Sequence, residues 1–170
     1  MRRDPLANPE PLIRRVYAYA AYRLGDGPDA EDVTSETFER ALRYRVSFDP
    51  QKGKPAAWLV GIARRCVDDH LMRRPVLLRE PIDEAAPGDL EVETAERAEL
   101  AAAVARLDAR EQELVALRYG ADLTARQIAQ LLGLSTNTVE VALHRALARL
   151  RRHLAPPIPG EVPAAAELAL

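Results

Sequence analysis

The chain has 170 residues, of which 48% are hydrophobic, 29% charged and 5% aromatic. This balance is typical of a soluble globular protein with one domain or two of about 60–70 residues, and the abundance of Ala, Leu, Arg and Glu favours helices. No apolar run approaches the roughly 20 residues of a membrane helix, a secretory signal is lacking, and a single cysteine, Cys66, excludes an internal disulfide. We therefore expect a cytoplasmic protein without membrane insertion.

The formal net charge of −2 conceals an uneven distribution. Residues 1–74 have a net charge of +3, residues 75–100 of −6 and residues 101–154 of +3. Two mildly basic blocks thus flank an acidic connector, a pattern that the total charge hides and that is compatible with nucleic-acid partners.

Proline breaks helix interiors, so the proline-free intervals show where long helices fit. In the first interval, Asn8 is expected to cap a helix that has Pro9 at its first position and ends at Gly25. Apolar residues recur in it at helical spacing and predict one buried stripe. The stripe consists of Ile13, Val16, Tyr17, Ala20 and Leu24.

Two further helices are expected before residue 75. Asp29 is expected to cap the first of them, and a basic loop from Ser47 to Pro55 with the only lysines of the chain follows. The next helix ends before Pro75. Its inward residues are expected to be Trp58, Leu59, Ile62, Ala63, Cys66 and Leu71. The three helices predict one helical unit.

Residues 75–95 contain prolines and many acidic residues, which is typical of a flexible linker. Beyond the linker, Asp108 with Glu111 and Thr124 with Gln127 have the spacing of capping boxes. The fold class is therefore all-α, with two small helical domains joined by a flexible acidic linker. The parts are a domain at 8–74, the linker at 75–95, a domain at 96–154 and a flexible tail at 155–170.

Residues 123–150 predict a helix-turn-helix. Thr124 caps a short helix, Gly133 supplies the left-handed turn residue, and Ser135 caps a second helix. The core side of that second helix has Val139, Leu143, Leu147 and Leu150, and the opposite stripe runs from Asn137 to Ala148. A helix presented in this way fits the major groove of DNA. The alternative is a helical hairpin whose turn happens to use Gly and Ser.

At this point the chain resembles the sigma factors of the extracytoplasmic-function (ECF) type in the bacterial sigma-70 family. Region four of that family matches Ile128-Ala129, Leu132-Gly133, Ser135, Thr138-Val139, Leu143, Arg145-Ala146 and Leu150. Region two matches Asp29-Ala30-Glu31-Asp32-Val33, Phe38, Arg40-Ala41, Trp58-Leu59, Ile62-Ala63-Arg64, Asp69-His70-Leu71 and Arg73-Arg74. The resemblance covers roughly residues 10–74 and 96–153, and both regions occur in the family's order.

The resemblance implies a sigma factor that binds core RNA polymerase and promoter DNA. In region four, which binds the polymerase flap, the residues expected to meet the minus-thirty-five element are Thr136, Asn137, Glu140, Val141, His144, Arg145 and Arg149. In region two, those expected to meet the minus-ten element and phosphates upstream of it are Lys52, Lys54, Trp58, Arg64, Arg65, Arg73 and Arg74. Those expected to contact the polymerase clamp are Glu31, Asp32, Ser35 and Glu36.

Some positions depart from the family pattern. Glu140, Val141 and Ala142 stand where the family often has Lys, Ser and Arg, so a changed target sequence and a weak minus-thirty-five reading both stay open. Ser35 replaces a common Gln, and Arg65 replaces an Asn. The alternatives to a sigma factor are a stand-alone helix-turn-helix regulator and a polymerase-binding adaptor that lacks promoter reading.

For the state without polymerase, two arrangements stay open: the two domains pack together, or an inhibitory partner, an anti-sigma factor, holds them. An enzyme is not expected. The histidines His70, His144 and His153 have no metal-ligand spacing on a buried face, Cys66 lies on an apolar stripe, and a Gly-rich phosphate loop is missing. We therefore expect no catalytic residue, metal, cofactor or small-molecule substrate.

Overall fold

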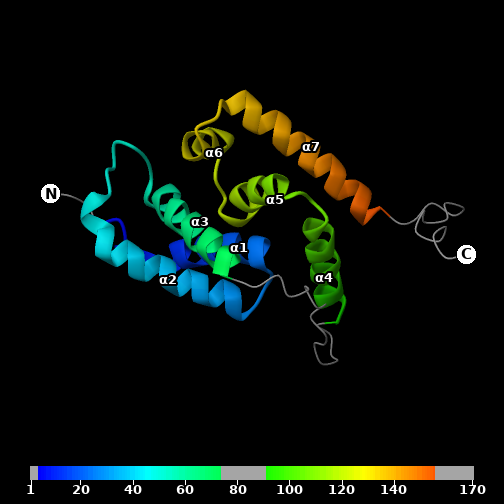
Figure 1. The fold of residues 1–170 in the computed structure, drawn as a ribbon, viewed down its shortest axis with the longest axis horizontal. Helices are drawn as coiled ribbons and strands as arrows, with labels where there is room; N and C mark the ends of the chain where they lie inside the picture. The colour runs from blue at the N-terminus through cyan, green and yellow to red at the C-terminus, as the bar shows by residue number, and fades with distance from the viewer. Residues whose placement is uncertain (1–3, 74–90, 156–170) are drawn as a thin grey trace, which may run out of the picture.

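The computed structural model describes residues 4–73 and 91–155, which form helices and turns without a strand (Figure 1). The all-helical expectation is confirmed for this part of the chain. Three helices that pack against one another make up the N-terminal unit, and a short 3₁₀ turn follows the second. These elements are α1 (Pro9–Leu24), α2 (Pro28–Tyr44), η1 (Arg45–Ser47) and α3 (Pro55–Arg73).

Each helix of this unit begins at a proline, whose ring fixes a helical φ and whose missing N–H is not needed in a first turn. Asn8 is the N-cap of α1, as predicted, although its side chain makes no capping hydrogen bond, and Gly25 ends the helix at a φ of 93°. The expectation that Asp29 caps α2 is wrong. Gly27 is the N-cap, because the helix starts at Pro28, two residues earlier than a cap at Asp29 would place its start, and Asp29 lies in the first turn.

The C-terminal unit has four α-helices and one π-helical turn within the described residues. They are α4 (Glu91–Ala105), α5 (Ala109–Val115), η2 (Ala116–Gly120), α6 (Ala125–Leu132) and α7 (Thr136–Leu154). Both predicted capping boxes form, at Asp108 with Glu111 and at Thr124 with Gln127. These reciprocal hydrogen bonds satisfy backbone donors that a helix start would otherwise leave unpaired.

Residues 91–95 were expected to belong to the linker. Helix α4 begins at Glu91, so residues 91–95 are helical. The stretch from 95 to 103 consists of strong helix formers without Pro or Gly, and propensity here outweighs the acidic composition. Residues 74–90 and 156–170, which hold the rest of the expected linker and nearly all of the expected tail, lie outside the described residues.

One hydrophobic core runs through both units, because α1 contacts α2 and α3 on one side and α5 and η2 on another. The N-terminal unit contributes Val16, Tyr19, Ala20, Val33, Leu59, Val60, Ala63, Cys66 and Val67, among others. The C-terminal unit contributes Leu114, Leu117, Ala121, Leu123, Ile128, Val139 and Leu143, among others. A second, smaller cluster joins α4 to α7. No helix among the described residues is long and apolar enough to cross a membrane.

Two residues expected in the core are exposed instead. Ile13 is 43% exposed and Leu71 is 40% exposed, so their predicted burial is wrong. The buried stripe of α1 consists of Val16, Tyr19, Ala20 and Arg23. This stripe is displaced from the predicted one because α1 packs against the C-terminal unit as well as its own.

Candidate nucleic-acid interface

Helices α6 and α7 form the predicted helix-turn-helix. Gly133 has a φ of 67°, a left-handed conformation that glycine adopts without strain, and the N–H of Leu134 then donates to the carbonyl of Ala129 at 2.9 Å. The Oγ of Ser135 accepts from the N–H of Thr138 at 3.1 Å and caps α7. The turn therefore holds α7 at the edge of the molecule farthest from α2 (Figure 1).

Helix α7 buries one face and exposes the other. Val139, Leu143, Ala146 and Leu150 are buried. All seven residues predicted to meet DNA in this region are exposed: Thr136, Asn137, Glu140, Val141, His144, Arg145 and Arg149. Ala142, which the predicted exposed stripe did not include, is half-buried against the core. A face of this kind, at the start of a capped helix, can enter a major groove.

Arg149 is held by the C-terminal unit itself. Its Nη1 lies 3.1 Å and 3.2 Å from the two carboxylate oxygens of Glu111 and 3.7 Å from Oδ2 of Asp108. These are the two residues of the α5 capping box. Arg149 thus connects α7 to the start of α5, and its charge is partly neutralised on a helix face that also carries Glu140.

The loop before α3 carries two exposed cations and leads to an aromatic residue at the start of that helix. Lys52 and Lys54 are exposed, and Trp58 follows in the first turn of α3. The Trp58 ring is half-buried and meets the ring of Phe48 in a tilted arrangement, with centroids 5.5 Å apart. Trp58 therefore packs against the core and still presents part of its surface, an arrangement suited to a stacked base between backbone-binding cations.

The arginines of α3 differ in their surroundings. Arg65 is exposed, whereas the Nε of Arg64 donates to Oε1 of Glu113 in the C-terminal unit. Arg73 is exposed and lies 3.9 Å from Oε1 of Glu36 and 4.0 Å from Oδ2 of Asp69. Arg74 lies outside the described residues. Of the α3 arginines that the structure describes, Arg65 is exposed and has no ion pair with another described residue, as is also true of Lys52 and Lys54 in the loop before the helix.

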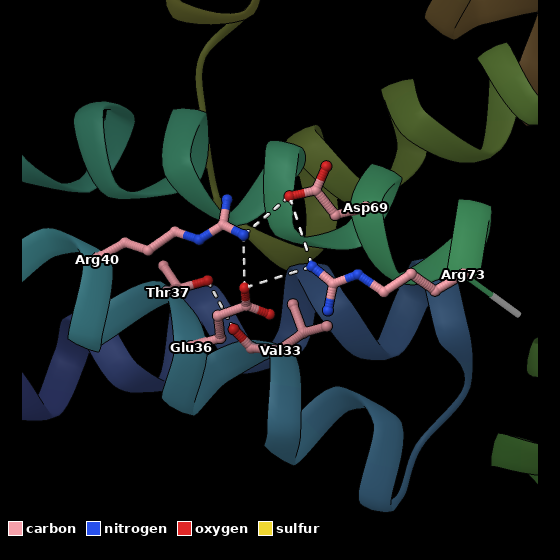
Figure 2. A network of polar contacts seen from close by, with 6 residues as sticks. All are labelled: Val33, Glu36, Thr37, Arg40, Asp69 and Arg73. Atoms are coloured by element: carbon pink, nitrogen blue, oxygen red, sulfur yellow. Dashed lines mark hydrogen bonds and ion pairs between the residues drawn. The ribbon is translucent and has the colours of Figure 1, made fainter.

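The residues of α2 that are expected to contact the polymerase clamp differ in their exposure and ion pairing. Glu31, Asp32 and Ser35 are exposed. Figure 2 shows that Glu36 points toward α3. Arg40, also on α2, places its Nη2 2.5 Å from Oε1 of Glu36 and 2.8 Å from Oδ2 of Asp69 on α3. The hydrogen bond that Arg40 donates to Asp69, with a smaller effect of the one that it donates to Glu36, raises the pKa of Arg40 although burial acts to lower it. Glu36 therefore helps to hold α2 against α3.

The ion pairs between the two units were not predicted from the sequence. Nη1 of Arg23 lies 3.6 Å from Oε1 of Glu113, and Nη2 of Arg15 lies 3.0 Å from Oδ2 of Asp122. Arg23 is a buried arginine at the end of the buried stripe of α1, an unusual position for a cation without a partner. Its burial is known only from the structure, because the predicted stripe did not include it.

Two family models match the chain. Residues 10–75 match "Sigma-70 region 2", and residues 97–150 match "Sigma-70, region 4". The ECF RNA polymerase sigma factor BldN of Streptomyces coelicolor is 39% identical over 147 residues, which cover 82% of this chain and 56% of that protein. The chain thus spans little more than half the length of this relative.

Two other proteins extend the comparison. The ECF RNA polymerase sigma factor RpoE of Cereibacter sphaeroides is 32% identical over 130 residues, covering 74% of this chain and 70% of that protein. The solved structure of the sigma factor RpoE of Bartonella quintana, in complex with the anti-sigma factor NepR, has a TM-score of 0.67 at 22% identity. It covers 84% of this chain and 91% of that one, and it shows that the fold is shared.

Proposed function

This chain belongs to the ECF group of the sigma-70 family of RNA polymerase sigma factors, and we propose that it binds core RNA polymerase, directs it to promoters and opens the promoter DNA. The observation that carries the proposal is the presence of both regions in one chain, with the groove-facing residues of α7 exposed. The chemistry of RNA synthesis belongs to the polymerase, so we assign no enzymatic activity to this chain and place its action in the cytoplasm.

For the duplex element, the proposed contacts are the exposed residues of α7. Thr136, Asn137 and Glu140 stand in its first two turns, where a helix in a major groove reaches base edges. Glutamate accepts from the N4 amino group of cytosine, so Glu140 favours a target with cytosine at the facing position. Arg145 is exposed for a phosphate, whereas Arg149 must first leave Glu111.

For the melted element, the proposed contacts are Lys52, Lys54 and the exposed part of Trp58. Cations hold the phosphate backbone, and an aromatic ring stacks on a base of any identity. Arg65, followed by Arg64 and Arg73 once they leave their carboxylates, would hold phosphates of the duplex upstream. These roles are supported by exposure and by the family's region two.

For polymerase, the proposed contacts on the clamp side are Glu31, Asp32 and Ser35, all exposed on α2. Glu36 contributes through the position of α2, because its carboxylate is already bound to Arg40. Packing of the two units is one of the two arrangements expected without polymerase, and it is the one that the structure has. An anti-sigma factor remains a proposed partner, and recovery of the chain from native cells with polymerase alone would count against a dedicated inhibitor.

The experiment is transcription in vitro with purified core polymerase and a fragmented genomic template. Core binding with discrete start sites is expected, and the aligned upstream sequences then report what Glu140 and Val141 accept. The paired change of Lys52 and Lys54 to alanine is expected to reduce promoter opening and to leave core binding intact. Arg14→Ala serves as control, because Arg14 is also an exposed cation of the same unit.

Two alternative functions make different predictions in this assay. Glu140 on the exposed face of α7 and the pairing of Arg149 favour an adaptor that binds polymerase without reading promoters. Core binding without start sites would select the adaptor and overturn promoter recognition. Binding to duplex DNA without any affinity for core polymerase would instead select a stand-alone regulator.

A further inference from the structure

The two units meet backbone to backbone at one point. A Cβ added to Gly120 of η2 would lie 2.9 Å from the carbonyl carbon and oxygen of Ala18 and 2.9 Å from the nitrogen of Tyr19. Real Cβ atoms do not approach backbone atoms so closely. Gly120 itself lies in a helical turn, a conformation open to any residue, so only the neighbouring unit demands glycine here.

Ion pairs surround this contact. The Glu113 carboxylate is 14% exposed, accepts from Nε of Arg64 and lies 3.6 Å from Nη1 of Arg23. Arg15 and Asp122 form a further pair at 3.0 Å, nearer to solvent. In each case the cation comes from the N-terminal unit and the carboxylate from the C-terminal unit. We call the Gly120 contact and these pairs the seam.

Next to the ion pairs of the seam lies a buried hydroxyl without a hydrogen-bond partner in the described part of the chain. The Tyr19 side chain is fully buried, and its Oη has no hydrogen-bond partner among the described residues. Burial raises the pKa of Tyr19, which keeps the hydroxyl protonated. The charges that act on it include Arg23, Arg64 and Glu113, so the hydroxyl lies close to the ion pairs of the seam. A buried hydroxyl without a partner destabilises the state that buries it, by a factor of about 5–30 in an equilibrium constant.

The closed seam is incompatible with simultaneous reading of two promoter elements. Elements named minus ten and minus thirty-five are separated by about 25 base pairs, or roughly 85 Å at 3.4 Å per base pair. In the structure, the two regions that would read them share one hydrophobic core. Arg64, a proposed phosphate contact, is meanwhile bound to Glu113.

We propose that the seam is an autoinhibitory contact in which Glu113 withholds Arg64 from promoter DNA, and that the unpaired Tyr19 hydroxyl keeps the closed state weak enough to open. That the seam inhibits promoter binding rests on the proposed sigma function, whereas the existence of the seam does not depend on that function. Removing the hydroxyl then strengthens closure, an effect opposite in sign to that of most changes in a buried side chain. A methyl group at Gly120 acts as a wedge and weakens closure.

The test is single-molecule fluorescence energy transfer on the full chain, with dyes at Glu39→Cys and Ala148→Cys in a Cys66→Ala background. Residues 39 and 148 are exposed on α2 and α7, one in each unit. Tyr19→Phe is expected to lower the open fraction about 5- to 30-fold. Gly120→Ala is expected to raise it about tenfold or more. Circular dichroism confirms that each variant is folded.

Matched controls separate the seam from the chemical change itself. Tyr44→Phe makes the same replacement at a side chain that is 58% exposed, and Gly53→Ala adds a methyl where nothing lies within 4 Å. Both are expected to leave the open fraction unchanged. An open fraction that rises in Tyr19→Phe, or equals that of Tyr44→Phe, would overturn the proposal, as would a wild-type chain without a closed population.

Core polymerase is then added to the labelled chains. We expect polymerase to raise the open fraction less readily in Tyr19→Phe, and more readily in Gly120→Ala, than in the wild-type chain. This result would support both the seam and the sigma function. If both variants change the open fraction without polymerase but the chain never binds polymerase, the seam is supported and the sigma function is overturned.

Discussion

The N-cap of α7 offers a direct test of how the recognition helix is held. The Ser135 Oγ accepts from the N–H of Thr138 at 3.1 Å and lies 2.7 Å from its hydroxyl oxygen. Ser135→Ala removes both contacts and leaves a backbone donor of the first turn without its partner. Loss of a serine cap costs about 1 kcal/mol, and in a chain of this size that corresponds to a fall in Tm of roughly 2–4 °C.

The measurement is thermal unfolding followed by circular dichroism, with two comparison variants. Ser135→Gly is expected to lower Tm by much less than Ser135→Ala, because glycine at an N-cap costs only a few tenths of a kcal/mol. Ser35→Ala makes the same chemical change on the exposed face of α2 and is expected to leave Tm unchanged or slightly higher, since alanine is the better helix former. Equal Tm values for Ser135→Ala and Ser35→Ala would refute the capping role.

Three further predictions concern the core and the DNA face. Leu59 is fully buried, so Leu59→Ala should lower the free energy of unfolding by about 2–5 kcal/mol in urea titrations, whereas Leu42→Ala, at a side chain 56% exposed, should change it by under about 0.5. Burial raises the pKa of the Cys66 thiol, so Ellman's reagent should react slowly until urea unfolds the chain. Glu140→Lys should steepen the salt dependence of promoter binding by about one in log–log slope, and an unchanged slope would place this residue away from phosphates.

The capping residues and the helix-turn-helix follow from the sequence because their contacts are local. The two capping boxes join residues three positions apart, and Gly133 acts on its own backbone. The prolines at helix starts act locally as well, although Pro28 and not Asp29 decides where α2 begins. The residues of the exposed α7 face were also predictable, since the spacing of Val139, Leu143 and Leu150 sets which side is buried.

The pairing of charges depends on residues far apart in the chain. Nothing near Arg64 in sequence indicates that Glu113, 49 positions away, binds it. Likewise, the capping-box acid Glu111 engages Arg149, 38 positions later. Spacing within a helix states which side chains share a face, but it does not state which other helix that face meets. For this reason the predicted phosphate contacts include arginines that are already paired in the closed structure.

The sequence by itself thus determined the helices, because propensity, capping and apolar periodicity act over a few residues, and its resemblance to the family's two regions indicated the class of protein. Only the tertiary structure decided that α1 packs against both units. That packing exposes Ile13, buries Tyr19 without a hydrogen-bond partner and leaves room for nothing larger than glycine at position 120. These features depend on how close two helices from distant parts of the chain approach, and that distance is set by the packing of the whole core.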